Sequence, residues 1–194
     1  MDSFTVCVYC GSRAGRLPAY ADAAREVGRL IAERGWGMVY GGGKAGLMGL
    51  VADAALAGGA EVVGVIPRSL MEREVGHRGL GKLHVVDTLH QRKQMMAERA
   101  DAFITLPGGI GSMEELFEVW SWRQLGYHDQ PIGLLDVEGY YEPLIGLIAR
   151  MVDQGFVSQA CSAMLQTGHD PAELLDRLAA QARGSSRRDD YART

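Results

Sequence analysis

Short apolar runs alternate along this chain with longer segments in which apolar residues recur at helical spacing. Each run is bounded by glycine, proline or charged residues, which is typical of strands buried in a sheet. We predict strands at residues 5–9, 36–40, 61–66, 83–86, 102–106 and 132–135, with 163–166 as a candidate last strand.

The intervening segments predict helices. Val27, Leu30 and Ile31 belong to one apolar stripe, in a helix that begins at Pro18 and stops at Gly35. Further helices are predicted at residues 47–58, 88–100, 112–125, 140–154 and 171–182. Strict alternation of strands and helices predicts the α/β class, with a doubly wound parallel sheet and helices on both faces. Residues 67–81 interrupt the alternation and are interpreted as an irregular, solvated loop.

Length and composition favour one folded unit. A chain of 194 residues can bury one sizeable core and is short for two domains. We find no internal repeat and no linker, and we predict a single domain over residues 1–182. Residues 183–194 are rich in glycine, serine and charge, which predicts a disordered tail.

Charge and targeting signals limit the possible partners. The net charge of −4 provides no basic footprint for nucleic acid. No apolar run has the length needed to span a membrane, and the N-terminus lacks the basic region and cleavage pattern of a secretory signal. We therefore expect a cytoplasmic protein that binds neither nucleic acid nor membranes.

The cysteines do not indicate redox or metal chemistry. Their number, three, is odd and argues against a disulfide framework. Cys7 and Cys10 form a C-x-x-C pattern at the first predicted strand, where residues three apart face opposite sides, and no second Cys/His pair completes a zinc site. The five histidines show no ligand spacing either. We expect no bound metal.

The stretch from Phe103 to Trp122 carries the strongest functional signal. A buried strand ends in the sequence PGGIG at 107–111, where the glycines remove side chains and let backbone N–H groups approach a ligand. Ser112 and Glu115 then have the spacing of a capping box, which predicts that a helix starts at Ser112. Because a helix N-terminus favours anions, the stretch predicts a site for the phosphate of a nucleotide or sugar phosphate.

Two interpretations of Glu115 are open from these residues. Its side chain can close the capping box with Ser112, which is a structural role. Alternatively, it is an acid beside a bound phosphate and takes part in chemistry. A glycine-rich turn between a strand and a helix is common in α/β proteins, so the loop alone does not decide between the two.

Two more glycine loops follow the first and second predicted strands, at residues 10–15 and 41–46. In a parallel sheet all three loops emerge at one edge, where ligands bind. The G-x-G-x-x-G pattern at 41–46 matches the dinucleotide fingerprint, but it follows the second strand and the expected acid, Glu61, begins the next strand instead of ending it. Lys44 lacks the following serine or threonine of a P-loop. We therefore disfavour a dehydrogenase and an NTPase.

Two spaced motifs resemble those of a known family. Residues 89–96 read LHQRKQMM and residues 107–115 read PGGIGSMEE. Together they closely resemble the M-H-x-R-K and P-G-G-x-G-T-x-x-E motifs of the LONELY GUY family of cytokinin-activating phosphoribohydrolases. Segments near residues 10–12, 41–49, 74–77 and 139–141 are similar to family segments too, so the resemblance covers about residues 3–178. Leu89, Ser112 and Ser121 stand where the family usually has methionine, threonine and threonine, and the two serines keep a hydroxyl.

The resemblance implies a Rossmann-like fold and a homodimer or larger homo-oligomer. It also implies hydrolysis of the N-glycosidic bond of cytokinin riboside 5′-monophosphates, or of AMP, to free base and ribose 5-phosphate, without a cofactor. Arg92 and Glu115 would be the catalytic pair, whereas the local sequence alone also allows Arg92 to be a solvated helix residue. The expected substrate contacts are Ser12, Gly42, Gly43, Glu74, Lys93, Gly108, Gly109, Ile110, Gly111, Ser112, Met113, Glu114 and Ser121.

Two other functions are alternatives to hydrolysis. A lysine decarboxylase, the name long given to many members of the family, needs pyridoxal phosphate on a lysine, and the chain has only Lys44, Lys82 and Lys93. A nucleotide carrier without turnover would bind AMP and release no base.

The assembly hypothesis concerns the helices at 88–100 and 112–125. Phe117, Trp120 and Trp122 give the second of them more large apolar surface than one buried face requires. We therefore expect these two helices to pack against a partner chain.

Overall fold

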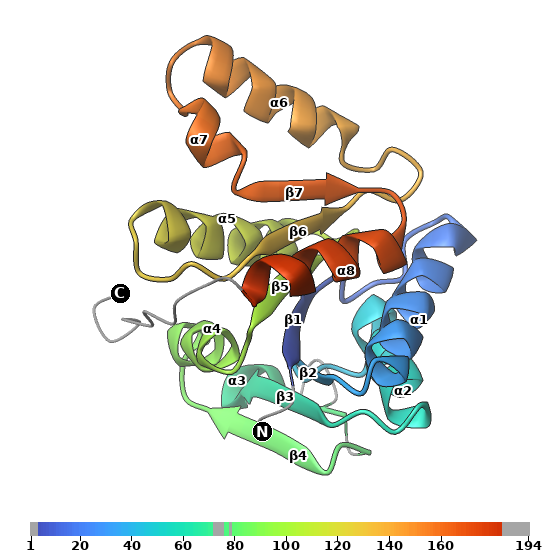
Figure 1. Cartoon of the computed structure of the whole chain (residues 1–194). Coiled ribbons are helices and arrows are strands. Elements are labelled where there is room, and N and C mark those ends of the chain that lie inside the picture. The colour runs from blue at the N-terminus through green and yellow to red at the C-terminus, as the bar shows by residue number, and fades with distance from the viewer. Residues whose placement is uncertain (1–3, 72–75, 78, 184–194) are drawn as a thin grey trace.

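One seven-stranded sheet organises the protein (Figure 1). The computed structural model describes residues 4–71, 76–77 and 79–183. The strands are β1 (Thr5–Tyr9), β2 (Gly37–Tyr40), β3 (Val62–Pro67), β4 (Lys82–Val86), β5 (Ala102–Thr105), β6 (Ile132–Leu135) and β7 (Leu165–Gly168). They lie in the order β4-β3-β2-β1-β5-β6-β7, and every neighbouring pair is parallel. The predicted parallel sheet is confirmed.

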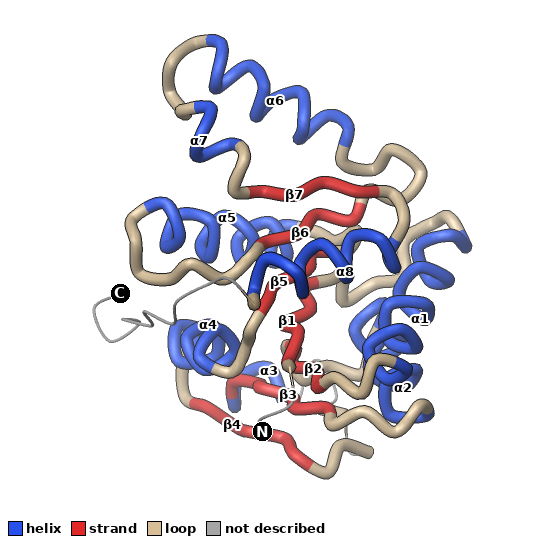
Figure 2. The backbone as a smooth tube through the Cα atoms, viewed as in Figure 1, coloured by secondary structure: helices blue, strands red, loops and turns tan. Residues whose placement is uncertain are grey.

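Helices alternate with the strands and cover both faces of the sheet (Figure 2). They are α1 (Pro18–Glu33), α2 (Gly46–Ala57), α3 (Arg68–Met71), α4 (Leu89–Glu98), α5 (Ile110–Gln124), α6 (Glu142–Asp153), α7 (Gln159–Ser162) and α8 (Pro171–Ala182). Apolar residues of α1, α2 and α8 form one core layer, and those of α4 and α5 contribute to the layer on the opposite face. The predicted α/β, doubly wound arrangement is therefore confirmed.

The central strands are apolar on both sides because both faces of the sheet are covered. Every residue of β2, β3, β5 and β6 is buried, whereas β4, at one edge, keeps two exposed residues. Cys7 belongs to one core layer and Cys10 to the other, so the predicted opposite orientation of these cysteines is confirmed.

The short elements were not predicted. The segment at 67–81, interpreted as an irregular loop, contains α3 directly after β3, and α7 precedes the last strand. Each of these helices has four residues, too few for a helical repeat to show in the sequence. The last strand lies at 165–168, two residues later than the candidate at 163–166.

The order of the strands creates a switch point between β1 and β5. The chain proceeds from β1 outward through β2 and β3 to β4, and then returns to place β5 on the other side of β1. The loops that follow β1 and β5 therefore turn to opposite faces and leave a crevice at the carboxyl ends of these strands. Such a crevice is the usual ligand site of open α/β sheets.

A buried histidine should make stability depend on pH. His128 is 3% exposed, and burial lowers its pKa to about 4. Between about pH 6.5 and pH 4 the unfolded chain therefore binds a proton that the folded chain does not. The free energy of unfolding should fall over this window by about 3 kcal/mol from this group alone. Denaturant titrations at pH 7 and pH 4 check the value.

The control for this prediction is His128→Gln. In the parent, His128 Nε2 lies 2.8 Å from Val119 O, and the glutamine amide can donate to the same carbonyl without titrating. This variant should lose about 3 kcal/mol less than the parent over the same pH interval. Equal losses in the two proteins would show that His128 is not responsible.

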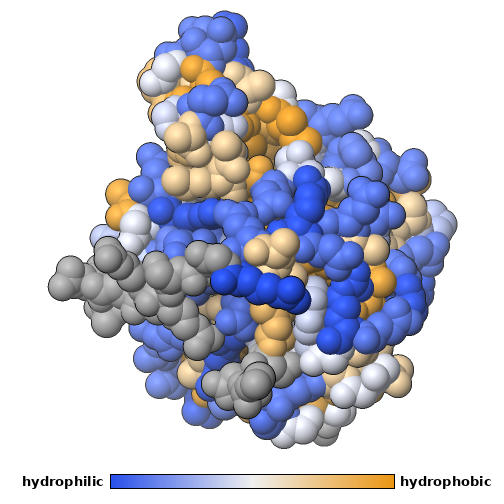
Figure 3. Space-filling model, in the orientation of Figure 1, coloured by the Kyte–Doolittle hydropathy of each residue, from blue (hydrophilic) through white to orange (hydrophobic). Residues whose placement is uncertain are grey.

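Hydrophilic residues cover most of the face seen in Figure 3, with a hydrophobic cluster where α6 and α7 rise above β7. A groove of about 380 Å³ lies there, lined by apolar side chains that include Ile145, Ile148 and Val152. Over the part of the chain that the structure describes, no helix combines the length and the apolar character that crossing a membrane requires.

Candidate active site

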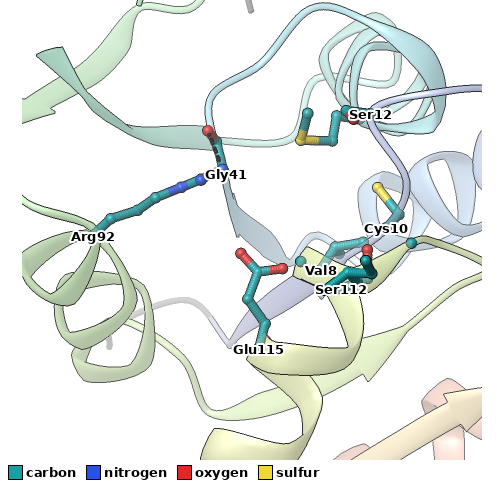
Figure 4. Close-up of a pocket in the computed structure, with 11 residues that line it drawn as sticks. Val8, Cys10, Ser12, Gly41, Arg92, Ser112 and Glu115 are labelled. Carbon is teal, nitrogen blue, oxygen red and sulfur yellow. Dashed lines mark hydrogen bonds between the residues drawn. The ribbon is translucent and has the colours of Figure 1, made fainter. Parts of the chain in front are cut away.

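A pocket of about 180 Å³ occupies the crevice at the switch point (Figure 4). The end of β1 and its loop form one wall, and the start of α5 forms the other. Gly41 and Met48 come from the second glycine loop and from α2, and Arg92 reaches in from α4. The residues that line it are Val8, Cys10, Ser12, Gly41, Met48, Arg92, Gly109, Ile110, Gly111, Ser112 and Glu115.

The N-terminus of α5 opens into this pocket. The helix starts at Ile110 with Gly109 as its N-cap, and the first helical hydrogen bond runs from Met113 N–H to Gly109 O at 3.1 Å. The backbone N–H groups of residues 110–112 therefore have no partner within the helix. We call residues 109–112 the anion cradle, because these donors and the positive end of the helix dipole favour an anion.

The glycines of the cradle leave room for a ligand. A Cβ atom built on Gly109 or Gly111 meets no other atom within 4 Å. Neither residue has a positive φ, so neither packing nor backbone conformation requires a glycine there. A missing side chain beside free donors keeps the approach to those donors open.

We predict that a methyl group at position 111 fills this space. Gly111→Ala should fold at least as stably as the parent, because alanine is favoured over glycine within a helix by about 1 kcal/mol. Its affinity for AMP should fall about tenfold, since the methyl group occupies the approach to the cradle. Calorimetric titration with AMP and a melting curve measure both effects.

The matched control is Gly146→Ala, which lies within α6 and also has open space around its Cβ position. It should gain similar stability and bind AMP as the parent does. Unchanged AMP affinity in Gly111→Ala would contradict the assignment of the cradle.

The predicted capping box is wrong. The helix begins two residues before Ser112, and no side chain caps its N-terminus. Ser112 is instead a buried residue of the first turn, and its side chain packs beside Gly108. Glu115 is therefore too far into the helix to close a cap, which removes the structural interpretation of this acid. Its half-buried carboxylate extends into the pocket (Figure 4).

Arg92 is not a solvated helix residue. Its side chain is 8% exposed and crosses from α4 to the ends of two strands. Nη2 donates to Gly41 O at 2.9 Å and Nε donates to Val65 O at 3.2 Å. A guanidinium has five N–H donors, so these two bonds leave three for other acceptors. A Cβ atom on Gly41 would lie 2.0 Å from Arg92 Nη2, so a side chain at this position would displace the guanidinium from its present place.

The apolar floor of the pocket was missed by the sequence analysis. Val8 was predicted only as part of a buried strand, and neither Cys10 nor Met48 was predicted as a site residue. Only the position of these three residues beside glycine loops at one edge of the sheet could have indicated a site. Burial raises the pKa of the Cys10 thiol well above its ordinary value, and the charge of Glu115 adds to this effect. Cys10 therefore stays a neutral thiol, which makes it a poor nucleophile.

The second glycine loop has a structural role at this edge. The N–H groups of Leu47 and Met48, in the first turn of α2, donate to Gly11 O at 3.0 and 3.4 Å. A Cβ atom on Gly46 would lie 2.4 Å from the backbone of the loop after β1. These two first-turn donors of α2 are thus used within the protein, which argues against a dinucleotide phosphate at this helix end.

Gly42 and Gly43 do not line the pocket. Gly42 O accepts a hydrogen bond from His77 N–H at 3.1 Å, and Gly43 pairs with Gly76 in an isolated bridge. His77 is buried, and its Nε2 lies 2.8 Å from Asp53 Oδ1. These contacts hold residues 76–77 against the second glycine loop and α2. Glu74, an expected substrate contact, lies outside the described residues.

The remaining expected contacts lie at the rim of the site or away from the pocket. Gly108 precedes the cradle and lines a neighbouring cavity. Lys93 Nζ bonds to Glu114 at 3.0 Å and to Glu118 at 2.9 Å, between α4 and α5. Burial opposes the charge of Lys93, but the hydrogen bonds to Glu118 and Glu114 outweigh it, so its pKa is raised. Met113 and Ser121 are absent from the lining of this pocket.

The tryptophans of α5 do not form an apolar surface. Trp120 and Trp122 are 5% and 7% exposed and belong to the core, so the argument that they exceed one buried face is wrong. Trp120 Nε1 donates to Cys161 O at 3.0 Å. Phe117, at 36%, is the exposed member of the three.

Comparison with known proteins identifies the family. A family model described as a possible lysine decarboxylase matches residues 48–178. Cytokinin riboside 5′-monophosphate phosphoribohydrolase LOG of Oryza sativa subsp. japonica is 49% identical over 173 residues, which cover 89% of this chain and 72% of the relative. The corresponding enzyme LOG1 of Arabidopsis thaliana is 47% identical, over 89% of this chain and 81% of the relative. The chain belongs to this phosphoribohydrolase family.

Solved structures agree on the fold. The molybdenum cofactor binding protein from Rippkaea orientalis has a TM-score of 0.70 at 18% identity, over 93% of this chain and 98% of that chain. The molybdenum cofactor carrier protein from Chlamydomonas reinhardtii also has a TM-score of 0.70 at 18% identity, over 94% and 99%. Identity this low shows the fold alone, and the Rossmann-like fold that the family resemblance implied is confirmed.

Proposed function

We propose that this member of the phosphoribohydrolase family hydrolyses the N-glycosidic bond of cytokinin riboside 5′-monophosphates, or of AMP. The products are the free base and ribose 5-phosphate. The observation that carries the proposal is the convergence of Arg92, Glu115 and the anion cradle on one pocket at the switch point. The identity of 46–49% to family members supports the same reaction.

The reaction needs a group that stabilises positive charge on the sugar. As the C1′–N bond breaks, its electron pair moves to the base and the ribose acquires oxocarbenium character, as in other glycoside hydrolyses. Glu115 supplies a carboxylate inside the pocket and accepts the proton of the attacking water or stabilises the sugar charge. The water oxygen forms the new bond to C1′, and the base nitrogen that leaves takes up a proton.

The cradle and Arg92 serve to position the substrate. Backbone N–H groups at the start of α5 bind the 5′-phosphate, which fixes the ribose relative to Glu115, one turn into the same helix. Arg92 is itself fixed by the carbonyl groups of Gly41 and Val65. Its remaining N–H donors then bind substrate oxygens or orient the carboxylate of Glu115. Because the side chain is already held in place, binding costs little of its conformational entropy.

The rivals gain no comparable support. A decarboxylase that uses pyridoxal phosphate needs a lysine in the site, and none of the three lysines lines the pocket. Lys93 is committed to two glutamates, and Lys82 pairs with Glu61 at an exposed position. Solved carrier proteins share the fold at 18% identity, and a likeness of the fold alone does not indicate which ligand this chain binds.

One chromatogram separates the enzyme from a carrier. The purified protein is incubated with AMP, with isopentenyladenosine monophosphate and, as a control without phosphate, with adenosine. We expect stoichiometric free base and ribose 5-phosphate from the monophosphates and little base from adenosine, because only the monophosphates engage the cradle. Recovery of intact nucleotides after they have bound would support a carrier and reject the proposal.

We also propose a homodimer or larger homo-oligomer in which α4 and α5 face a partner chain. Support comes from the exposed apolar residues Leu89 on α4, Phe117 on α5 and Leu125 at the C-cap of α5, and from the membership in the family. Sedimentation at micromolar concentration should give at least twice the mass of the 21.0 kDa chain. A monomer under these conditions would contradict the assembly.

A further inference from the structure

The backbone that leads from β5 into the anion cradle is held at three consecutive carbonyl groups. Leu106 O accepts a hydrogen bond from the hydroxyl of Tyr141 at 2.7 Å. Pro107 O accepts one from Gly11 N–H at 3.0 Å, and Gly108 O accepts one from the hydroxyl of Tyr140 at 2.6 Å. The two side-chain donors come from the segment between β6 and α6, far away in the sequence.

This segment adopts a conformation that needs support. Glu138 has φ 53° and Gly139 has φ 69°, so two consecutive residues are left-handed, and the first of them is not a glycine. Left-handed non-glycine residues are uncommon and persist where the surrounding structure fixes them. Asp136, which is 1% exposed, accepts the Tyr141 N–H at 2.7 Å through Oδ1. The result of this turn is that both hydroxyl groups reach the same loop.

The two tyrosines differ in burial, although both hydroxyl groups donate to carbonyl groups of the same loop. Tyr141 is 2% exposed, and burial raises its pKa, so it stays a neutral O–H donor. Tyr140 is 41% exposed and packs edge-to-face on Tyr141 and on Tyr20, with ring centroids 4.8 and 5.6 Å away. Tyr140, Tyr20 and Gly108 line a cavity next to the pocket. Because the C=O and N–H groups of one trans peptide unit point in opposite directions, the Gly109 N–H points away from the Tyr140 hydroxyl that bonds to Gly108 O.

We infer that Tyr140 and Tyr141 are positioning residues for phosphate binding, an inference that rests on the proposed function. Gly108 and Gly109 have no side chains to restrain the peptide units around them. Without the Tyr140 hydroxyl the Gly108–Gly109 unit can rotate and present its carbonyl oxygen, instead of the Gly109 N–H, to the phosphate. The Tyr141 hydroxyl holds the carbonyl that precedes Pro107 and so fixes the start of this loop. The hydroxyls hold the carbonyls on the far side and keep the cradle in its binding form before the substrate arrives.

The test uses Tyr140→Phe and Tyr141→Phe, with Tyr20→Phe as the matched control from the same cavity. Ribose 5-phosphate is titrated calorimetrically into each protein, and kcat and KM are measured with AMP. We expect Kd for ribose 5-phosphate to rise about threefold in Tyr140→Phe and about tenfold in Tyr141→Phe. KM should rise in parallel while kcat stays within about twofold, because the phosphate is bound equally in the ground and transition states. Tyr20→Phe should match the parent.

Each outcome has a distinct meaning. Lower melting temperatures with unchanged Kd and KM would reduce both tyrosines to a structural role and overturn the inference. A parent that binds ribose 5-phosphate and releases no base would reject the proposed function, while the Kd series would still decide the inference. If Tyr141→Phe fails to fold, Tyr140→Phe decides alone, and if the parent releases base without measurable binding of ribose 5-phosphate, the KM series with AMP decides the inference.

Discussion

Glu115→Gln should fold, bind AMP and lose almost all activity. Gln keeps the size of the side chain and its hydrogen-bonding oxygen but removes the negative charge. Because Gly109 and not Ser112 is the N-cap of α5, the change removes no helix cap. We expect the free energy of unfolding to stay within about 1 kcal/mol of the parent and kcat to fall by about 10²–10⁴, the contribution typical of a general base.

The measurement combines a melting curve, an AMP titration and a base-release assay on one preparation. Glu118→Gln is the matched control, because it removes a carboxylate from the same helix, one turn further along, where Glu118 bonds to Lys93 outside the pocket. That variant should keep its kcat. Parental activity in Glu115→Gln would show that the carboxylate is not part of the chemistry.

Arg92→Ala should lose activity and also stability. Removal of the side chain leaves the carbonyl groups of Gly41 and Val65 without their present donor in a buried place. Buried polar groups left unsatisfied cost about 1–3 kcal/mol, so the melting temperature should fall by several degrees. kcat/KM should fall by at least about 10²-fold, because the permanent cation of the pocket is gone. Arg92→Lys keeps the charge, but its single ammonium group cannot bond to both carbonyl groups as the planar guanidinium does. This variant should recover little activity.

The variant Arg123→Ala shows whether the loss of activity in Arg92→Ala comes from lost stability or from a change in the site. Arg123 lies on α5, and its Nη1 donates to Met164 O at 2.9 Å, away from the pocket. This variant should lose comparable stability and keep its activity. If Arg92→Ala and Arg123→Ala lose activity to the same extent, the effect of Arg92 follows from weakened folding, and its role in the site is refuted.

The fold was accessible from the sequence because the apolar runs are short and their spacing is regular. A parallel sheet buries both sides of its strands, so β2, β3, β5 and β6 are recognisable without any tertiary information. The glycine loop after β5 was also recognisable, since a strand, a turn and a helix follow each other directly. Helices of a single turn, such as α3 and α7, leave no periodic signal.

The site was only partly accessible, because its decisive contacts join distant residues. Arg92 lies on a mostly polar helix, and its burial depends on carbonyl groups that are 27 and 51 residues away in the sequence. Glu115 fits the spacing of a capping box as well as that of an acid in a site. The position of the helix start, two residues before Ser112, decides between these, and that start depends on the extended backbone of Gly109. Three further lining residues belong to the hydrophobic core as well as to the pocket, so the sequence does not distinguish them from ordinary core residues: Val8, Cys10 and Met48.

A crystal structure of Glu115→Gln with AMP tests the assignment of the pocket most directly, since this variant should bind the nucleotide without cleaving it. We expect the 5′-phosphate to lie against the backbone N–H groups of residues 109–112. We also expect C1′ of the ribose to lie between the guanidinium of Arg92 and the side chain at position 115. AMP bound elsewhere on the protein, or with C1′ remote from both side chains, would contradict the assignment of this pocket as the active site.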